Sequence, residues 1–312
     1  MAKLLTQLAQ LLAGEIPARP DWDGLMQLVS DELIVPQMLA RVGGAAQLLP
    51  ADVYAYLAET QRRSILRNER LFSTLEDVLR VLNAAGVEPL LLKGAAQWAA
   101  PSGPGDRLIR DLDLMVRPEE VERSVDGLRA AGFGILSDER ANALHDVVVL
   151  GRPTDVGSID LHQHAPGSKT HAACADLYAH ARRVSVAGGA ALVLRPEAQV
   201  YVIIIHDQVH DARFWRGGHD LRHLLDIAAL SKGDVDWNAV AAMCRSRTER
   251  IALSAELHAA RAIAGADVPQ HMLTLWPRLH YWRQVAQFEQ PALTALVGRM
   301  RALRAALAGV SP

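Results

Sequence analysis

The stretch Arg110-Asp111-Leu112-Asp113-Leu114-Met115-Val116 places two aspartates inside an apolar run. In an extended strand, side chains two residues apart point to the same face of the sheet. Asp111 and Asp113 are therefore expected to project together, about 7 Å apart along the strand. Leu112 and Leu114 then take the opposite, buried face. Two carboxylates this close repel each other unless a cation lies between them, so the stretch predicts a strand with a cation site.

Two further apolar runs carry polar residues that extend this site. Leu90-Leu91-Leu92-Lys93-Gly94 precedes the aspartates, and Ile159-Asp160-Leu161-His162 follows them. If Asp160 lies on a neighbouring strand, the three carboxylates form an all-oxygen site suited to Mg²⁺ or Mn²⁺. Lys93 offers a positive charge to phosphate groups, or alternatively forms a structural ion pair with Asp111. Together these runs predict a site for a metal ion and a phosphate-bearing ligand.

These motifs, with a later His-rich helix and Leu-Arg-x-Leu-Leu-Asp at 221–226, resemble a known family. This is the bacterial uncharacterised nucleotidyltransferase family of the DNA polymerase β-like superfamily. The resemblance runs from about residue 90 to residue 230. It implies a nucleotidyltransferase fold in which Asp111, Asp113 and Asp160 bind the metals. It also implies that the turn at Lys93 faces the triphosphate of a nucleotide.

Several other residues near the acidic pair are candidates for binding nucleotide phosphates. The backbone N–H groups of Gly94 and Ala95, at the expected start of a helix, can bind an anion. Arg107 and Arg110 flank the aspartates, and a guanidinium can bind phosphate bidentately. The resemblance favours Arg107, whereas Arg110 is equally explained as a solvated surface charge. By the same resemblance, His162 positions the substrate or orients the third carboxylate.

The expected reaction transfers a nucleoside monophosphate from an NTP, such as ATP, to an acceptor and releases pyrophosphate. Two metal ions can activate an attacking hydroxyl and neutralise the leaving group, and Asp160 can accept the proton. The acceptor is a small molecule, a protein or peptide, or an RNA end. Asn in place of either Asp111 or Asp113 is expected to abolish transfer while the fold survives.

Two other function classes remain open at this stage. One is a non-catalytic protein of the same fold that binds nucleotide and has a regulatory role. The other is a zinc-dependent hydrolase that uses histidine ligands, although no Glu follows His206 as in the H-E-x-x-H motif. The candidate ligands of that zinc site are His162, His164 and His171, or else His206, His210 and Asp211. The alternative for His145, His206 and His210 is that they line or support the nucleotide pocket.

Aromatic and charged residues in the C-terminal part have two explanations each. Phe214, Trp215 and Trp282 offer surfaces on which a base can stack, or they pack between helices. Arg222 and Asp226 are four residues apart in a helical pattern. They therefore form a pair on the helix surface or brace the contact between domains.

The spacing of apolar residues indicates an α+β chain, with helices before and after a segment of short strands. We expect an N-terminal helical region at 1–73, a polymerase β-like core at 74–195 and a C-terminal helical region at 196–312. Expected strands are at 87–92, 112–116, 133–136, 147–150 and 158–162, with a hairpin at 183–186 and 191–194. Expected helices are at 54–82, 119–131, 197–210, 220–231, 237–245 and 250–264, followed by a C-terminal Ala/Leu/Arg helix.

Composition excludes some classes of protein. The net charge of −2 disfavours a protein whose main task is coating nucleic acid, which we expect only as an acceptor. A basic track with interleaved aromatic residues is not evident, which disfavours a template-directed polymerase. Cys174 and Cys244 lack the spacing of a zinc site. With no signal peptide or long apolar run, we expect a soluble, cytoplasmic protein without a membrane partner.

Overall fold

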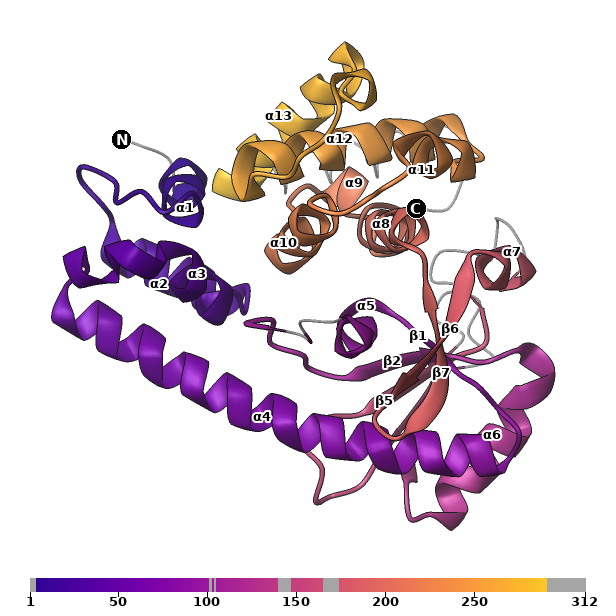
Figure 1. Cartoon of the computed structure of the whole chain (residues 1–312). Coiled ribbons are helices and arrows are strands. Elements are labelled where there is room, and N and C mark those ends of the chain that lie inside the picture. The colour runs from indigo at the N-terminus through magenta and orange to yellow at the C-terminus, as the bar shows by residue number, and fades with distance from the viewer. Residues whose placement is uncertain (1–3, 101–102, 104, 140–146, 165–173, 291–312) are drawn as a thin grey trace, which may run out of the picture.

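The computed structural model describes residues 4–100, 103, 105–139, 147–164 and 174–290. Its centre is a seven-stranded mixed sheet with the strand order β3-β4-β5-β2-β1-β7-β6 (Figure 1). The strands are β1 (Leu90–Leu91), β2 (Leu112–Met115), β3 (Gly134–Asp138), β4 (Val147–Gly151), β5 (Ile159–His162), β6 (Ala181–Val186) and β7 (Gly189–Leu194). Each expected strand is present, and the α+β class is confirmed.

The two faces of the central strands differ as the alternation of residues predicts. Leu112 and Leu114 of β2 lie in a hydrophobic core with Ile159 of β5. On the opposite face, Met115 packs with Leu90 of β1 in a smaller core. The β6–β7 hairpin belongs to the same sheet, because β7 pairs in parallel with β1. One face of the sheet is therefore apolar, and the other carries the polar residues of β2 and β5.

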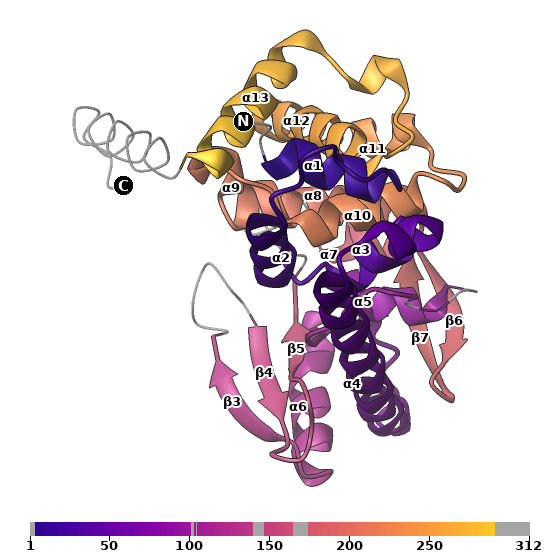
Figure 2. The ribbon, with the colours of Figure 1, turned by 90° about the vertical axis from the view of Figure 1, so that its left-hand side faces the viewer.

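Helices α4 (Ala51–Ala84) and α6 (Val121–Ala130) cover the apolar face (Figure 2). The 34-residue α4 contributes side chains to two hydrophobic cores. Val53 and Leu57, near its start, pack in the helical part of the molecule. Leu75 and Leu79, near its end, pack against the sheet. The expected boundary between residues 73 and 74 therefore falls inside one continuous helix.

The N-terminal and C-terminal helices form one body that faces the polar side of the sheet (Figure 1). Leu8 of α1 and Leu257 of α12 belong to the same hydrophobic core, and these two helices are in contact. The helices of this body are α1 (Leu4–Leu12), α2 (Trp22–Asp31), α3 (Val35–Val42), α8 (Pro196–Ile205), α9 (Arg213–Arg216), α10 (Leu221–Leu230), α11 (Trp237–Met243), α12 (Arg247–Ala264) and α13 (Leu275–Glu289). The short α5 (Lys93–Ala96) and α7 (Cys174–Ala179) lie in the segment that forms the sheet.

Some helix bounds differ from those expected from the sequence. The helix expected at 197–210 ends at Ile205 and continues as a π-helical turn, η5 (His206–His210). The helix α12 begins at Arg247, because the Ser246 side chain caps it by accepting a hydrogen bond from the Glu249 N–H. The expected Ala/Leu/Arg helix lies mainly outside the described residues. Within the described part, no helix is both long and apolar enough to cross a bilayer.

Candidate active site

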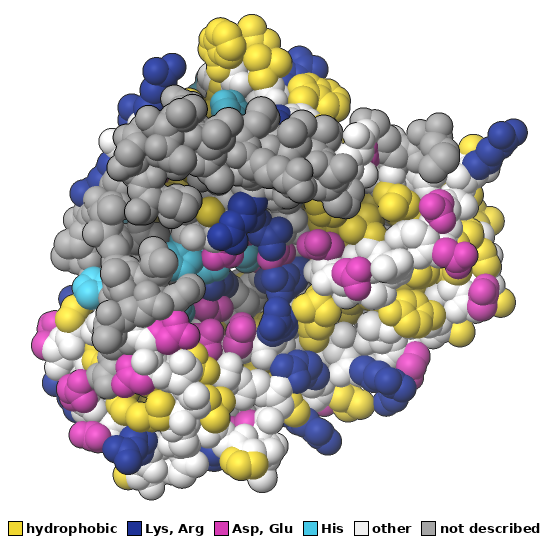
Figure 3. All heavy atoms as spheres, turned by 180° about the vertical axis from the view of Figure 1, so that it is seen from behind, with side chains coloured by type: hydrophobic (Ala, Val, Ile, Leu, Met, Phe, Trp, Pro, Cys, Tyr) yellow, Lys and Arg dark blue, Asp and Glu magenta, His cyan; other side chains and the backbone are white. Residues whose placement is uncertain are grey.

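Strand pairing brings together the three carboxylates that the sequence singled out. Strands β2 and β5 run in parallel, and Asp113 lies directly beside Asp160 in the pairing register. Asp111 comes immediately before β2. All three aspartates line one pocket between the sheet and the helical body. Figure 3 shows a hollow on this side of the molecule where acidic and basic side chains gather.

Lys93 is held inside this pocket by an ion pair with Asp113. Its Nζ donates to Asp113 Oδ1 over 2.8 Å, and the two side chains are only 13% and 8% exposed. Burial alone would lower the pKa of Lys93, but the charge of Asp113 and the neighbouring carboxylates raise it above its ordinary value. Lys93 thus remains cationic. Its partner is Asp113, not Asp111, the partner considered from the sequence.

The backbone at Lys93 is in an unfavourable conformation. Its φ is +46°, in the left-handed region that residues other than glycine rarely adopt. Such strain persists only where the surrounding structure enforces it, and it concentrates at functional sites. Here the turn between β1 and α5 directs the ammonium group at Asp113. The strain therefore supports a functional role for this turn.

His162 contacts the same carboxylate oxygen as Lys93. Its Nε2 lies 3.3 Å from Asp113 Oδ1, and both side chains are buried. Although burial favours the neutral acid, Lys93 and His162 hold the pKa of Asp113 well below its ordinary value. Both contacts are to Oδ1, and Oδ2 of Asp113 takes part in neither of them.

The pKa values of the other two aspartates are raised, whereas that of Asp113 is lowered. Burial, followed by the charge of Asp113, raises the pKa of Asp111. The same two causes, in the same order, raise the pKa of Asp160 to about 6. The Ser158 hydroxyl lies 3.2 Å from Asp160 Oδ1 and donates a hydrogen bond to it. The three aspartates therefore carry more negative charge than Lys93 alone neutralises, and an added cation would relieve their repulsion.

Arginines from the helical body form a second wall of the pocket, which the sequence analysis missed. Arg213 and Arg222 line it together with Asp220 and His223. Arg222 Nη2 donates to Asp220 Oδ2 over 2.6 Å, which orients its guanidinium. A signal was present in the sequence, since charged residues recur within an otherwise apolar helical segment. Arg110 lines the same pocket from the sheet side and is exposed.

Arg107 and Asp226 form a buried brace between the sheet domain and the helical body. Arg107 Nε and Nη2 donate to the two Asp226 oxygens over 2.9 and 3.1 Å, and the side chains are 8% and 6% exposed. The prediction that Arg222 pairs with Asp226 on the helix surface is therefore wrong. The alternative prediction, that Asp226 braces the contact between domains, agrees with the structure. Arg107 also lines the pocket, so its contact with phosphate stays a prediction.

Some of the remaining candidate residues line the pocket, and others do not. Gly94 lines it and approaches Ile109 closely, since an added Cβ would lie 3.2 Å from that side chain. Ala95 instead packs in the hydrophobic core, and α5 has only four residues. His206 and Asp211 line the pocket, whereas His164 does not. His145 and His171 lie outside the described residues.

The aromatic candidates lie away from the acidic pocket. Phe214 is buried and stacks on His280, with 5.0 Å between the ring centroids. Trp215 packs edge-on against Phe214, and Trp282 is 51% exposed on α13. Phe214, Trp215 and Trp282 do not line the pocket that holds the aspartates. For Phe214, helical packing is therefore the explanation that the structure supports.

Comparison with known proteins agrees with the geometry of the site. A family model described as uncharacterised nucleotidyltransferase matches residues 18–265. The match covers well over half of the chain and includes every residue that lines the pocket. No curated protein matches the chain. The chain therefore belongs to the uncharacterised nucleotidyltransferase family.

Proposed function

We propose that this protein transfers a nucleoside monophosphate from an NTP to an acceptor nucleophile, with Mg²⁺ or Mn²⁺ bound at Asp111, Asp113 and Asp160. Membership of the family supports nucleotidyl transfer. The observation that carries a metal-dependent mechanism is the parallel pairing of β2 with β5, which sets Asp113 beside Asp160 at the pocket. The acceptor is a small molecule, a protein or peptide, or an RNA end.

The residues fit a hard divalent cation. The donors are carboxylate oxygens, the ligand type that Mg²⁺ and Mn²⁺ prefer. Burial and, after it, the charge of Asp113 raise the pKa values of Asp111 and Asp160, so a bound cation would favour their ionised forms. When bound, the metal would neutralise phosphate charge and make an acceptor hydroxyl easier to deprotonate. We propose a mechanism that uses two such metal ions.

The protein's own groups supply binding, orientation and proton transfer. Asp160 accepts the proton of the attacking hydroxyl. The acceptor oxygen forms a bond to the α-phosphorus, and the bond from that phosphorus to the bridging oxygen breaks. The departing pyrophosphate then lies near Arg213 and Arg222, which can hold its charge. Lys93 keeps Asp113 ionised and in place.

The test is a labelling experiment with each of the four α-³²P NTPs. Purified protein is incubated with Mg²⁺ or Mn²⁺ and with cell extract as the source of acceptor. We expect label in a product and release of pyrophosphate with the wild type, and neither with Asp111→Asn. Label in protein, RNA or small molecules identifies the acceptor class. Equal labelling by both proteins would contradict the proposal.

Arg110→Ala is expected to weaken NTP binding without weakening the fold. Arg110 is exposed at the rim of the pocket, so its loss removes a phosphate contact and little packing. We expect KM for the NTP to rise about tenfold, equivalent to about 1.4 kcal/mol, with Tm unchanged. Arg70→Ala, an exposed arginine on α4, is the matched control. An unchanged KM would assign Arg110 to the solvated surface.

Lys93→Met is expected to make the stability of the protein depend on added metal. Without the ammonium group, Asp113 is left buried beside two other carboxylates. We expect a loss of about 3–5 kcal/mol in EDTA and a larger gain in Tm on adding Mg²⁺ than in the wild type. Thermal unfolding with and without Mg²⁺ measures both effects, with the exposed Lys232→Met as control. A Tm in EDTA equal to that of the wild type would contradict this role.

A further inference from the structure

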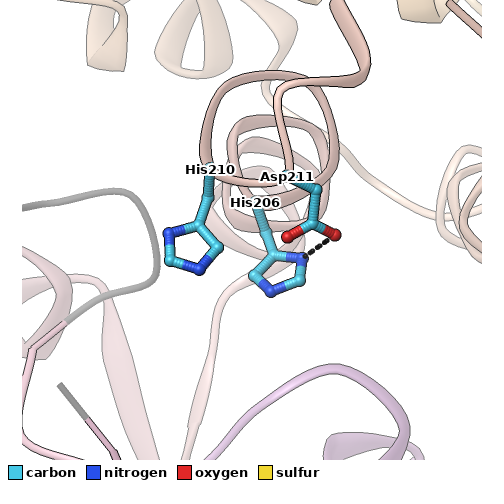
Figure 4. Close-up of side chains that lie close together, drawn as sticks. All are labelled: His206, His210 and Asp211. Atoms are coloured by element: carbon cyan, nitrogen blue, oxygen red, sulfur yellow. Dashed lines mark ion pairs between the residues drawn. The ribbon is translucent and has the colours of Figure 1, made fainter. Parts of the chain in front are cut away.

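The π-helical turn η5 presents a second group of metal-binding side chains. His206 and His210 project from the same side of this turn, and Asp211 follows directly (Figure 4). The imidazole rings stack with 5.2 Å between centroids and 25° between planes. One ligand atom from each of the three residues lies within 4.8 Å of the others. Single π turns inside α-helices are rare and frequently occur at functional sites.

The spacing within this group suits metal coordination better than hydrogen bonding. His206 Nδ1 lies 3.7 Å from Asp211 Oδ2, which is too long for a hydrogen bond. Two ligand atoms bound to one tetrahedral ion at about 2.0–2.1 Å lie roughly 3.4 Å apart. Among the described residues, His206 Nδ1 is buried and has no hydrogen-bond partner. A nitrogen at this distance from a carboxylate leaves room for one ion between the two groups.

A neighbouring cluster provides a contrast within the same helical body. Asp207, Asp220 and His223 also have ligand atoms within 4.8 Å of one another. There, however, Arg213 Nε lies 3.0 Å from Asp207 Oδ1, and Arg222 contacts Asp220. Guanidinium groups therefore already neutralise those carboxylates. Both groups place a histidine Nδ1 3.7 Å from a carboxylate oxygen, and the group on η5 differs in offering two imidazoles with its one carboxylate.

We propose that His206, His210 and Asp211 bind a divalent ion of the zinc class, separate from the acidic site on the strands. Nitrogen ligands favour Zn²⁺ and similar first-row ions, whereas Mg²⁺ prefers oxygen. Three protein ligands leave a fourth position open, as in catalytic zinc sites. His206 and Asp211, though not His210, also line the pocket of the three aspartates, so the ion would lie beside that pocket. This inference does not depend on nucleotidyl transfer.

Zinc binding by the purified full chain tests the proposal directly. The protein is dialysed against ZnCl₂ in excess Mg²⁺, and bound zinc is measured by elemental analysis; CoCl₂ then gives a visible absorption spectrum of the site. We expect about one zinc per chain for the wild type. We expect His210→Gln and Asp211→Asn each to weaken binding more than about tenfold, since losing even an outer partner of a ligand costs that much. Both residues are at least partly exposed, so the fold should survive, which circular dichroism confirms.

Three controls separate this site from other zinc binding. His271→Gln and Asp234→Asn, both exposed elsewhere, should bind zinc as the wild type does. Asp111→Asn should also retain zinc, because the acidic site supplies none of the ligands. The proposal is overturned if the wild type binds no zinc, or if His210→Gln and Asp211→Asn bind it unchanged. It is equally overturned if Asp111→Asn loses zinc while those two variants keep it.

Discussion

Asp111→Asn and Asp113→Asn are expected to abolish nucleotidyl transfer alike but to change stability in opposite directions. Each removes a proposed metal ligand, and loss of a bound metal would cost several kcal/mol of transition-state stabilisation, so activity should fall more than about a thousandfold. Asp111 has a raised pKa because it is buried beside Asp113, so its neutralisation relieves repulsion and raises Tm. Asp113 instead pairs with buried Lys93, and its neutralisation leaves that charge without its partner. We expect Asp113→Asn to cost about 3–5 kcal/mol.

Thermal unfolding in EDTA measures this difference, because no metal then compensates for either change. Asp126→Asn, an exposed position on α6, controls for the loss of a surface carboxylate. The sequence alone treats the two aspartates as equivalent, since both belong to one D-x-D motif. Equal Tm shifts for the two variants would show that the ion pair with Lys93 does not decide their stability.

Disrupting the brace between Arg107 and Asp226 is expected to destabilise the whole molecule. The pair is buried and joins the sheet domain to α10 of the helical body. Removing one partner leaves the other charge buried, so Arg107→Met or Asp226→Leu should each cost about 3–5 kcal/mol. The double variant replaces both charges by apolar groups, and it should recover much of that loss.

A double-mutant cycle by denaturant unfolding provides the measurement. Arg62 and Glu59 form an exposed pair on α4, and removing Arg62 should cost less than about 1 kcal/mol. If Arg107→Met leaves stability unchanged and raises only KM for the NTP, the residue contacts phosphate and is not a brace. If the losses of unfolding free energy in the two single variants simply add up in the double variant, that result would also argue against a brace.

The alternation of residues was sufficient to predict the central strands and the shared face of Asp111 and Asp113, whereas the place of Asp160 beside them was a condition supported by the resemblance. Leu112 and Leu114 point into the core, as a two-residue period requires. Parallel pairing of β2 with β5 then places Asp160 beside Asp113. The orientation of each strand's side chains follows from short-range patterns, because an apolar strand with one polar face has one favourable register.

Long-range choices of partner could not be predicted from the same patterns. Local spacing suggested that Asp226 pairs with Arg222, yet its partner is Arg107, far away in the sequence. The arginine wall of the pocket was missed for a related reason, since the charged residues of α9 and α10 do not by themselves indicate that these helices face the sheet. The domain boundary was obscured because α4 contributes to two cores. In each case the local sequence allows more than one arrangement, and tertiary packing decides which arrangement forms.

The central claim is that Asp111, Asp113 and Asp160 bind a metal–nucleotide complex. Calorimetric titration with a non-hydrolysable NTP tests it most directly, with the wild type and Asp111→Asn each measured in Mg²⁺ and in EDTA. We expect the wild type to bind in Mg²⁺ at least about tenfold more tightly than in EDTA, which is about 1.4 kcal/mol. Asp111→Asn should lose that difference. Equal affinity of the wild type with and without metal would contradict the claim and favour a non-catalytic nucleotide-binding protein.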